Sequence, residues 1–164
     1  MLTPVPITRD FAVTSALSSA DFERAAKLGF KTVVSLLPDG ERPDALSSKE
    51  TMAAAQASGM TFAYIPTSTL DIFSDRTVDA LQSVLNQTQG PVLAMCASGQ
   101  RAAIAWAAAR ARAHPVDAVL DSLLKAGLDL AFLRDELETQ ARQGARLAHK
   151  ERQRAAASCP QAAA

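Results

Sequence analysis

The strongest constraint on the fold is the stretch of residues 91–101 together with the alanine-rich run that follows it. Residues 92–95 are apolar and fit a short strand buried on both faces. Residues 102–111 favour a helix with almost no polar face. A strand, a tight loop and a helix in this order make a cradle for an anion, because backbone N–H groups converge at the positive end of the helix dipole.

The loop of this cradle carries a nucleophile and a cation. Gly99 can adopt the positive φ that curls the chain around an oxyanion, and Arg101 offers a planar fork for two oxygens. The field of the cradle should favour the thiolate of Cys96, which is then held against the bound anion. A lone buried cysteine is more often a core residue, but the joint pattern favours a reactive site. The predicted anion-binding residues beside Arg101 are Ala97, Ser98, Gly99 and Gln100.

Strand and helix patterns alternate along the chain. Helix starts are indicated by Ser18 with Asp21, by Ser47 with Glu50, and by Ser74 or Asp75. The alternation predicts a three-layer α/β fold, in which helices cover both faces of a mostly parallel sheet of about four to five strands. The expected strands are residues 11–14, 32–37, 62–65 and 92–95.

Three loops leave the carboxyl edge of this sheet, where ligands of such folds bind. They are residues 39–44, 67–74 and 96–101. Asp71, in the second loop, is a candidate general acid, although nothing in the sequence fixes its direction. In the first loop, the charged residues could line the rim of the site or form a solvent-exposed turn, which we favour. These charged residues are Asp39, Glu41 and Arg42.

Composition narrows the function classes. Seventeen basic and seventeen acidic residues leave no net charge, so nothing favours a nucleic acid or a charged membrane as partner. No apolar run is long enough to span a membrane, and two cysteines, Cys96 and Cys159, are too few for a disulfide scaffold. We therefore expect a cytoplasmic protein. His114 and His149 lack the spacing of metal ligands, and we predict neither a metal nor a cofactor.

The chain is expected to form one catalytic domain over residues 1–140. Leu130, Phe132, Leu133 and Leu137 mark its last packed segment. Residues 141–164 are polar and should form a partly disordered C-terminal helix or tail, since they have little to bury.

Several motifs together resemble the phosphatase-like domain family of beta-lactamase-hydrolase-like proteins. They are Leu-Pro-Asp-Gly-Glu-Arg-Pro-Asp at 37–44, Tyr-Ile-Pro at 64–66, Gly-Pro-Val-Leu-Ala-Met-Cys-Ala-Ser-Gly-Gln-Arg at 90–101, and Ala-Gly-Leu-Asp-Leu at 126–130. The resemblance covers roughly residues 11–137. It implies the fold of the cysteine-dependent dual-specificity phosphatases.

The loop departs from the phosphatase pattern, which is Cys-x5-Arg preceded by His and followed by Ser or Thr. Here the spacing is Cys-x4-Arg, with Met95 before the cysteine and Ala102 after the arginine. This shorter loop looks like that of rhodanese-type sulfurtransferases. We therefore predict first a sulfurtransferase that carries a persulfide on Cys96 and takes a small anionic sulfur donor.

Two other functions share the same cradle. One is a phosphatase that acts on a phosphorylated substrate through a phosphocysteine at Cys96, with Asp71 as the acid. The other is a non-catalytic module that binds an anion or a phosphopeptide.

Overall fold

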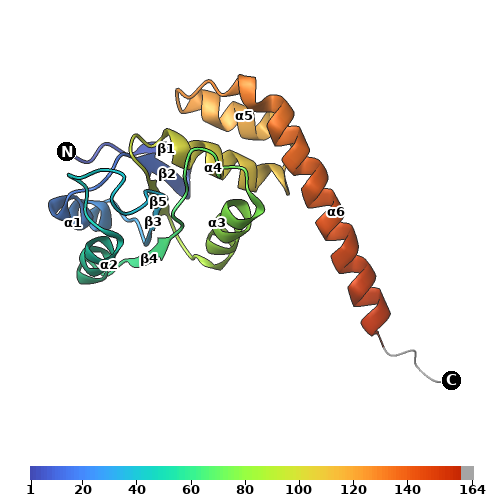
Figure 1. Ribbon diagram of the computed structural model, residues 1–164, viewed down its shortest axis with the longest axis horizontal. Coiled ribbons are helices and arrows are strands. Elements are labelled where there is room, and N and C mark those ends of the chain that lie inside the picture. Colours follow the sequence, from blue (N-terminus) through green and yellow to red (C-terminus); the bar gives the residue numbers. More distant parts are fainter. Residues whose placement is uncertain (160–164) are drawn as a thin grey trace.

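The computed structural model describes residues 1–159 and has a five-stranded sheet at its centre (Figure 1). The strand order is β1-β2-β5-β3-β4; only β1 is antiparallel to its neighbour. The predicted α/β fold with a mostly parallel sheet is confirmed. The edge strand β1 was not predicted; it contains Pro6, which an edge strand tolerates. The strands are β1 Val5–Thr8, β2 Phe11–Thr14, β3 Thr32–Ser35, β4 Thr61–Tyr64 and β5 Val92–Met95.

Side chains of the central strand β5 alternate between two separate apolar cores. Val92 and Ala94 join the core under α3, α4 and α5, while Leu93 and Met95 join the core under α1 and α2. This is the two-sided burial that a continuous apolar strand requires. One face of the sheet is thus covered by α1 Ser19–Lys27 and α2 Ser48–Ala57, and the other by α3 Asp75–Gln87, α4 Gln100–Ala111 and α5 Val116–Lys125 (Figure 1).

The helix starts follow the capping signals of the sequence. Ser18 and Ser47 form capping boxes with Asp21 and Glu50, and the Ser74 hydroxyl accepts a hydrogen bond from Thr77 N. Burial opposes ionisation of Asp21, but hydrogen bonds donated by the Ser18 hydroxyl and backbone N–H outweigh it and hold the pKa of this carboxyl below its usual value.

Helix α4 is buried on nearly every side, and small side chains make this possible. Its alanines at 102, 103, 105, 107, 108, 109 and 111 are all buried, and only Trp106 adds bulk to the core. Alanine combines the highest helix propensity with the closest approach of neighbouring elements. The helix that begins at the predicted cradle is therefore packed against the sheet, α3, α5 and the C-terminal helix α6 (Arg134–Ser158).

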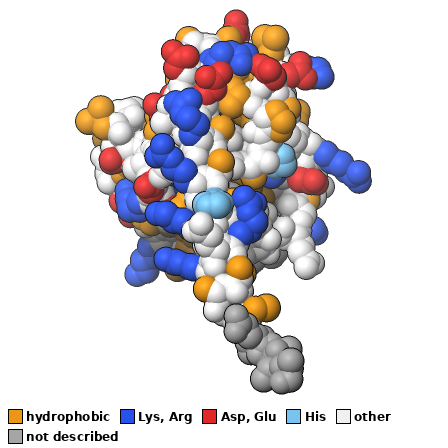
Figure 2. All heavy atoms as spheres, turned by 90° about the vertical axis from the view of Figure 1, so that its right-hand side faces the viewer, with side chains coloured by type: hydrophobic (Ala, Val, Ile, Leu, Met, Phe, Trp, Pro, Cys, Tyr) orange, Lys and Arg blue, Asp and Glu red, His pale blue; other side chains and the backbone are white. Residues whose placement is uncertain are grey.

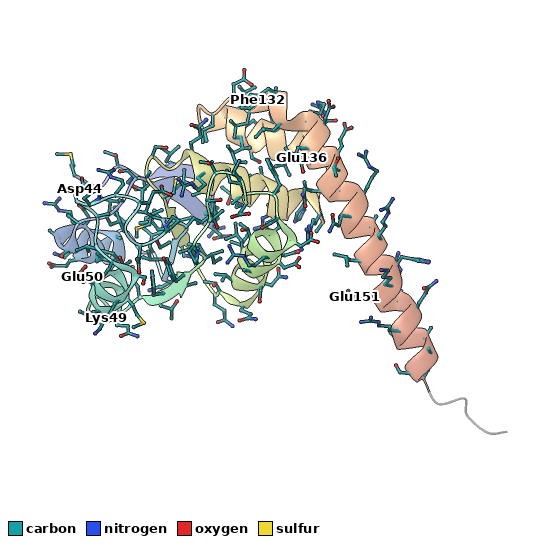
Figure 3. All side chains as sticks on the ribbon, viewed as in Figure 1. Asp44, Lys49, Glu50, Phe132, Glu136 and Glu151 are labelled. Carbon is teal, nitrogen blue, oxygen red and sulfur yellow. The ribbon has the colours of Figure 1, made fainter. Side chains whose placement is uncertain are left out.

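The C-terminal helix α6, Arg134–Ser158, follows the short 3-10 turn Ala131–Leu133. Leu137, Gln140 and Gly144 are buried on its packed side, so packing extends beyond the segment that the sequence indicated. Phe132, which was expected to be packed, is 73% exposed (Figure 3). Residues 149–159 are all exposed. The predicted disorder at residues 160–164 lies outside the described residues.

None of the helices among the described residues is both long and apolar enough to cross a membrane. Figure 2 faces the side from which α6 projects and shows Lys and Arg side chains over this surface, with acidic side chains mainly toward its upper part.

Candidate active site

The loop after β5 is closely packed against β2. The Cys96 N–H donates to Thr14 O at 3.4 Å, and the Cys96 side chain is buried, with 1% of its surface exposed. Gly99 has φ +89°, and a Cβ at this position would lie 3.3 Å from the Thr14 carbonyl carbon. The positive φ predicted for Gly99 is confirmed, and the tight contact to β2 is a second reason for glycine here.

A backbone amide of the loop points at the sulfur. The Gly99 N–H donates to Cys96 Sγ at 3.1 Å, while the Gln100 N–H is 3.4 Å from Ser98 Oγ. Gly99 is the N-cap of α4, so the sulfur lies at the N-terminal end of a twelve-residue helix. The sulfur therefore lies next to the backbone N–H donors that a bound anion would also meet.

Arg101 is fixed by two partners from two other loops. Its Nη1 donates to Thr67 O at 2.8 Å, and the two Nη atoms donate to the Glu41 carboxylate at 3.1 and 2.6 Å. The side chain is 10% exposed, yet its Nε is buried and has no hydrogen-bond partner. Arg101 is thus oriented by its Nη atoms, and its Nε is a charged donor without a protein partner.

Residues 39–44 form the largely exposed turn that we favoured, and two of their side chains also reach the site. Glu41 binds Arg101, and Arg42 Nη1 donates to the carbonyl of Ala97 at 3.3 Å. Asp39 anchors the loop, because its carboxylate accepts from the backbone N–H and the hydroxyl of Ser48 at 2.6 and 2.7 Å. The charged loop is therefore exposed to solvent and in contact with the cradle at the same time.

A small pocket of about 150 Å³ opens at the cysteine. Cys96, Arg101 and three of the four predicted loop residues line this pocket. The fourth, Gly99, does not line it but donates its N–H to the Cys96 sulfur. Sequence reasoning missed the three side chains that complete the wall, although two of them lie in the predicted loop 67–74. The lining residues are Thr69, Ile72, Cys96, Ala97, Ser98, Gln100, Arg101 and Ile104.

Asp71 lies on the rim loop but does not line the pocket. Its carboxylate accepts a hydrogen bond from Ser68 Oγ at 2.7 Å, and its carbonyl accepts from the Ser74 N–H at 3.0 Å. Its neighbours Thr69 and Ile72 do line the pocket. Catalytic contacts often tighten only when substrate is bound, so the role of Asp71 as an acid stays a prediction.

The site offers a nucleophile and anion-binding donors, without a metal cluster. Among residues 1–159, no group of three or more His, Cys, Asp or Glu side chains could hold a metal ion. No carboxylate from the described part of the chain lines the pocket either. The chemistry available is attack by sulfur on an anionic group bound by Arg101 and the loop amides.

Comparison with known proteins matches this arrangement to one family. The sequence profile of the beta-lactamase hydrolase-like protein, phosphatase-like domain, matches residues 5–113. Curated relatives named beta-lactamase hydrolase-like protein include one from Xylella fastidiosa, 29% identical over 103 residues, and one from Agrobacterium fabrum, 36% identical over 83 residues. These matches cover 63% and 51% of this chain but only 24% and 19% of the relatives, so the matched region is a small part of each relative.

Solved structures agree in fold. A Neisseria meningitidis protein described as a candidate phosphatase is 28% identical, with a TM-score of 0.71 over 83% of this chain and 96% of that one. The catalytic core of the PP-IP phosphatase Siw14 from S. cerevisiae is 18% identical, with a TM-score of 0.60 over 91% and 92% of the two chains, and shows the fold alone. With its sheet, its cysteine loop and its matched sequence, the chain belongs to the phosphatase-like domain family of beta-lactamase hydrolase-like proteins.

Proposed function

We propose that this chain is a cysteine-dependent phosphatase that hydrolyses phosphate esters through a phosphocysteine at Cys96. The observation that carries the proposal is the free Nε of Arg101. A buried guanidinium N–H without a partner is unfavourable by about 1–3 kcal/mol. Glu41 and Thr67 fix the Arg101 side chain, which lines the same pocket as Cys96. A phosphate oxygen would satisfy it.

The reaction would proceed in two displacements. First, the Cys96 thiolate attacks phosphorus; an S–P bond forms, the P–O bond to the leaving group breaks, and its electron pair departs with the oxygen. Second, water attacks phosphorus, the S–P bond breaks, and the thiolate is restored while the proton from water passes to phosphate or solvent. Arg101 and the loop amides would stabilise the charge on the three other phosphate oxygens in both steps.

The sulfurtransferase function, which we ranked first from the loop sequence, gains no support from the matched family profile or from the Neisseria meningitidis structure, which are described as phosphatase-like and as a phosphatase. It stays as the second candidate because of two features of this site. The pocket at Cys96 is small, and Ala102 supplies no hydroxyl that could help the thiolate to leave a phosphocysteine.

The pocket also suggests the substrate class. No carboxylate of the described chain lines it, so a leaving oxygen would depart without a proton from a side chain. We therefore propose substrates whose leaving group is stable as an anion, such as aryl phosphates or phosphoanhydrides, rather than alkyl phosphates. The rate should then depend steeply on the leaving-group pKa in a series of substituted phenyl phosphates, whereas a flat dependence would indicate a general acid such as Asp71.

The decisive assay compares phosphoryl and sulfur transfer on the same preparations. We expect turnover of p-nitrophenyl phosphate by the wild type, its loss in Cys96→Ser, and no change in Cys159→Ser, which removes the exposed cysteine instead. Sulfur transfer from thiosulfate to cyanide without phosphate turnover would favour the second candidate. Phosphate binding without either turnover would identify a binding module.

A further inference from the structure

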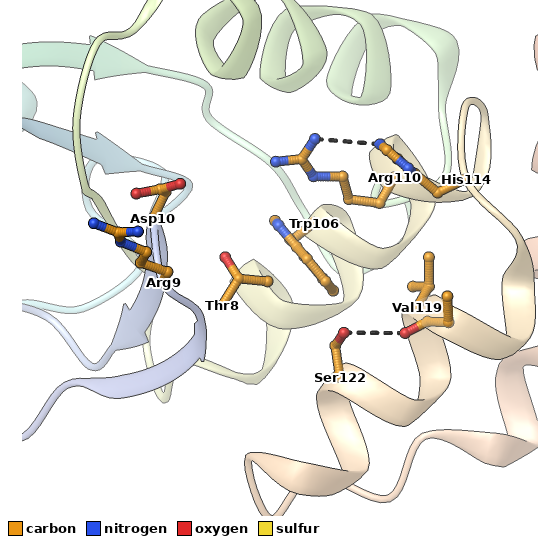
Figure 4. Close-up of a pocket in the computed structure, with 9 residues that line it drawn as sticks. Thr8, Arg9, Asp10, Trp106, Arg110, His114, Val119 and Ser122 are labelled. Carbon is orange, nitrogen blue, oxygen red and sulfur yellow. Dashed lines mark hydrogen bonds between the residues drawn. The ribbon is translucent and has the colours of Figure 1, made fainter.

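A second cavity, of about 320 Å³ (Figure 4), lies near the amino ends of β2 and β5, whereas the cysteine loop follows the carboxyl end of β5. It is bounded by the turn between β1 and β2, by the second half of α4 and by α5. Its lining residue Arg110 lies nine residues after Arg101, roughly 14 Å farther along the same helix. Its size is at the lower end of the range of about 300–1,000 Å³ typical of small-molecule sites.

The indole of Trp106 marks this cavity as a binding site. The ring stacks on Phe11 with a centroid distance of 5.7 Å, and the residue is buried, with 2% of its surface exposed. Its core role was predicted, but its Nε1 is buried without a hydrogen-bond partner. In Figure 4 the nitrogen-bearing edge of the ring is turned toward the side of the cavity where Arg110 lies. Buried indole N–H groups usually have an acceptor, and a ligand in this cavity could provide one.

The charges around the cavity favour an anion. Arg9 and Arg110 contribute two guanidinium groups, against one carboxylate from Asp10. Arg110 Nη1 lies 3.5 Å from a ring nitrogen of His114, so its charge is not neutralised there. Val119 and Trp106 also line the cavity and give it apolar surface.

We propose that this cavity binds a small organic anion with an apolar body, such as a short-chain carboxylate. One oxygen of the ligand accepts from Trp106 Nε1 and another from Arg110, while the hydrocarbon part lies against Val119 and the indole. This site is separate from the cysteine loop and does not depend on the function proposed for it.

The experiment uses hexanoate as the probe and Trp106 as the reporter, because it is the single tryptophan of the chain. We expect a saturable change in tryptophan fluorescence with hexanoate, and at least about tenfold weaker binding of hexanol, which lacks the charge. Arg110→Gln should weaken hexanoate binding by about tenfold or more. Arg146→Gln, which removes an exposed arginine of α6, should leave the affinity unchanged.

Two further variants locate the binding. Ser122→Leu fills the cavity without changing its charge and should abolish the hexanoate response, with a thermal midpoint near that of the wild type showing that it folds. Arg101→Ala, at the cysteine loop, should leave the response intact. Equal responses to hexanol and hexanoate would overturn the proposal, and so would a response that is lost in Arg101→Ala but kept in Arg110→Gln.

Discussion

The two ends of helix α4 carry arginines that are buried to a similar extent but used differently. Arg112, just after the helix, has a side chain 2% exposed, and all of its nitrogens are engaged. Its Nε donates to Gln140 at 3.1 Å, its Nη2 to Asp75 at 2.7 Å and its Nη1 to Asp79. Arg101, at the start, has its Nη atoms engaged and its Nε free.

We propose that this difference separates a structural arginine, Arg112, from a functional one, Arg101. The partners of Arg112 come from α3 and α6, so this side chain joins three helices and leaves no donor for a ligand. The partners of Arg101 come from the two rim loops and orient it without saturating it. Both side chains are largely buried and paired with carboxylates, so the unpartnered Nε is the feature that supports a ligand site at Arg101.

Replacing the functional arginine should have the largest effect. Arg101→Ala removes the donor that would hold the phosphate, and we expect kcat/KM for p-nitrophenyl phosphate, measured well below the Tm of the variant, to fall by about 10²–10³-fold. Arg101→Lys should recover little, since an ammonium cannot offer Nε and Nη donors together. Kinetics within threefold of the wild type would show that Arg101 does not bind substrate.

Replacing Arg112, the structural arginine, should reduce stability and leave the kinetics nearly unchanged. Arg112→Ala leaves Gln140 without its partner and opens a cavity between three helices, so we expect a loss of about 2–3 kcal/mol, or about 4–12 °C in Tm. Differential scanning calorimetry measures the loss, and kinetics well below the new Tm should be close to wild type. A large kinetic defect in folded Arg112→Ala would break the distinction between the two ends.

A substitution at Gly144, which packs against the Arg112 backbone, should reduce stability by a smaller amount. A Cβ at Gly144 would lie 2.1 Å from the Arg112 carbonyl oxygen, a clash with backbone that can be relieved only by moving α6. We expect Gly144→Ala to destabilise the protein by about 1–2 kcal/mol despite the higher helix propensity of alanine. The neighbouring exposed position serves as control, and Ala145→Ser should change Tm little.

The carboxylate of Asp21, which is remote from both ends of α4, should make a small contribution to stability that depends on pH. Hydrogen bonds from Ser18 lower the pKa of Asp21 against the opposing effect of burial, so the ionised carboxylate stabilises the fold above its unfolded pKa of 3.8. This contribution is lost as pH falls through the still lower folded value. The Tm of Asp21→Asn should lie below that of the wild type by an amount equivalent to about 1 kcal/mol or less at pH 7. A thermal-melt series should show the gap closing below pH 3.8, and a gap that widens there would contradict the assignment.

Much of the local structure could be predicted from short sequence patterns. The caps at Ser18 and Ser47, the positive φ of Gly99 and the loop between β5 and α4 follow from residues close in sequence. The edge strand β1 was missed because Pro6 weakens its strand pattern and its pairing with β2 is tertiary.

Long-range pairing accounts for the rest. Glu41 and Arg101 are sixty residues apart, and only the fold shows that they meet. In the same way, the sequence marks Gly144 only as a residue of low helix propensity. The structure shows that the Arg112 backbone packs against it and leaves no room for a side chain. The direction of Asp71 depends on its bond with Ser68, which the sequence did not indicate.

The most direct test of the central claim is to trap the covalent intermediate. Wild-type protein, quenched in acid during turnover of p-nitrophenyl phosphate, should show by intact-mass and peptide mass spectrometry the added mass of one phosphoryl group on Cys96. Cys96→Ser should carry no such group on residue 96, and Cys159→Ser should behave as the wild type. Added sulfur on Cys96 after thiosulfate treatment, with no phosphoryl group under turnover conditions, would contradict the phosphatase account.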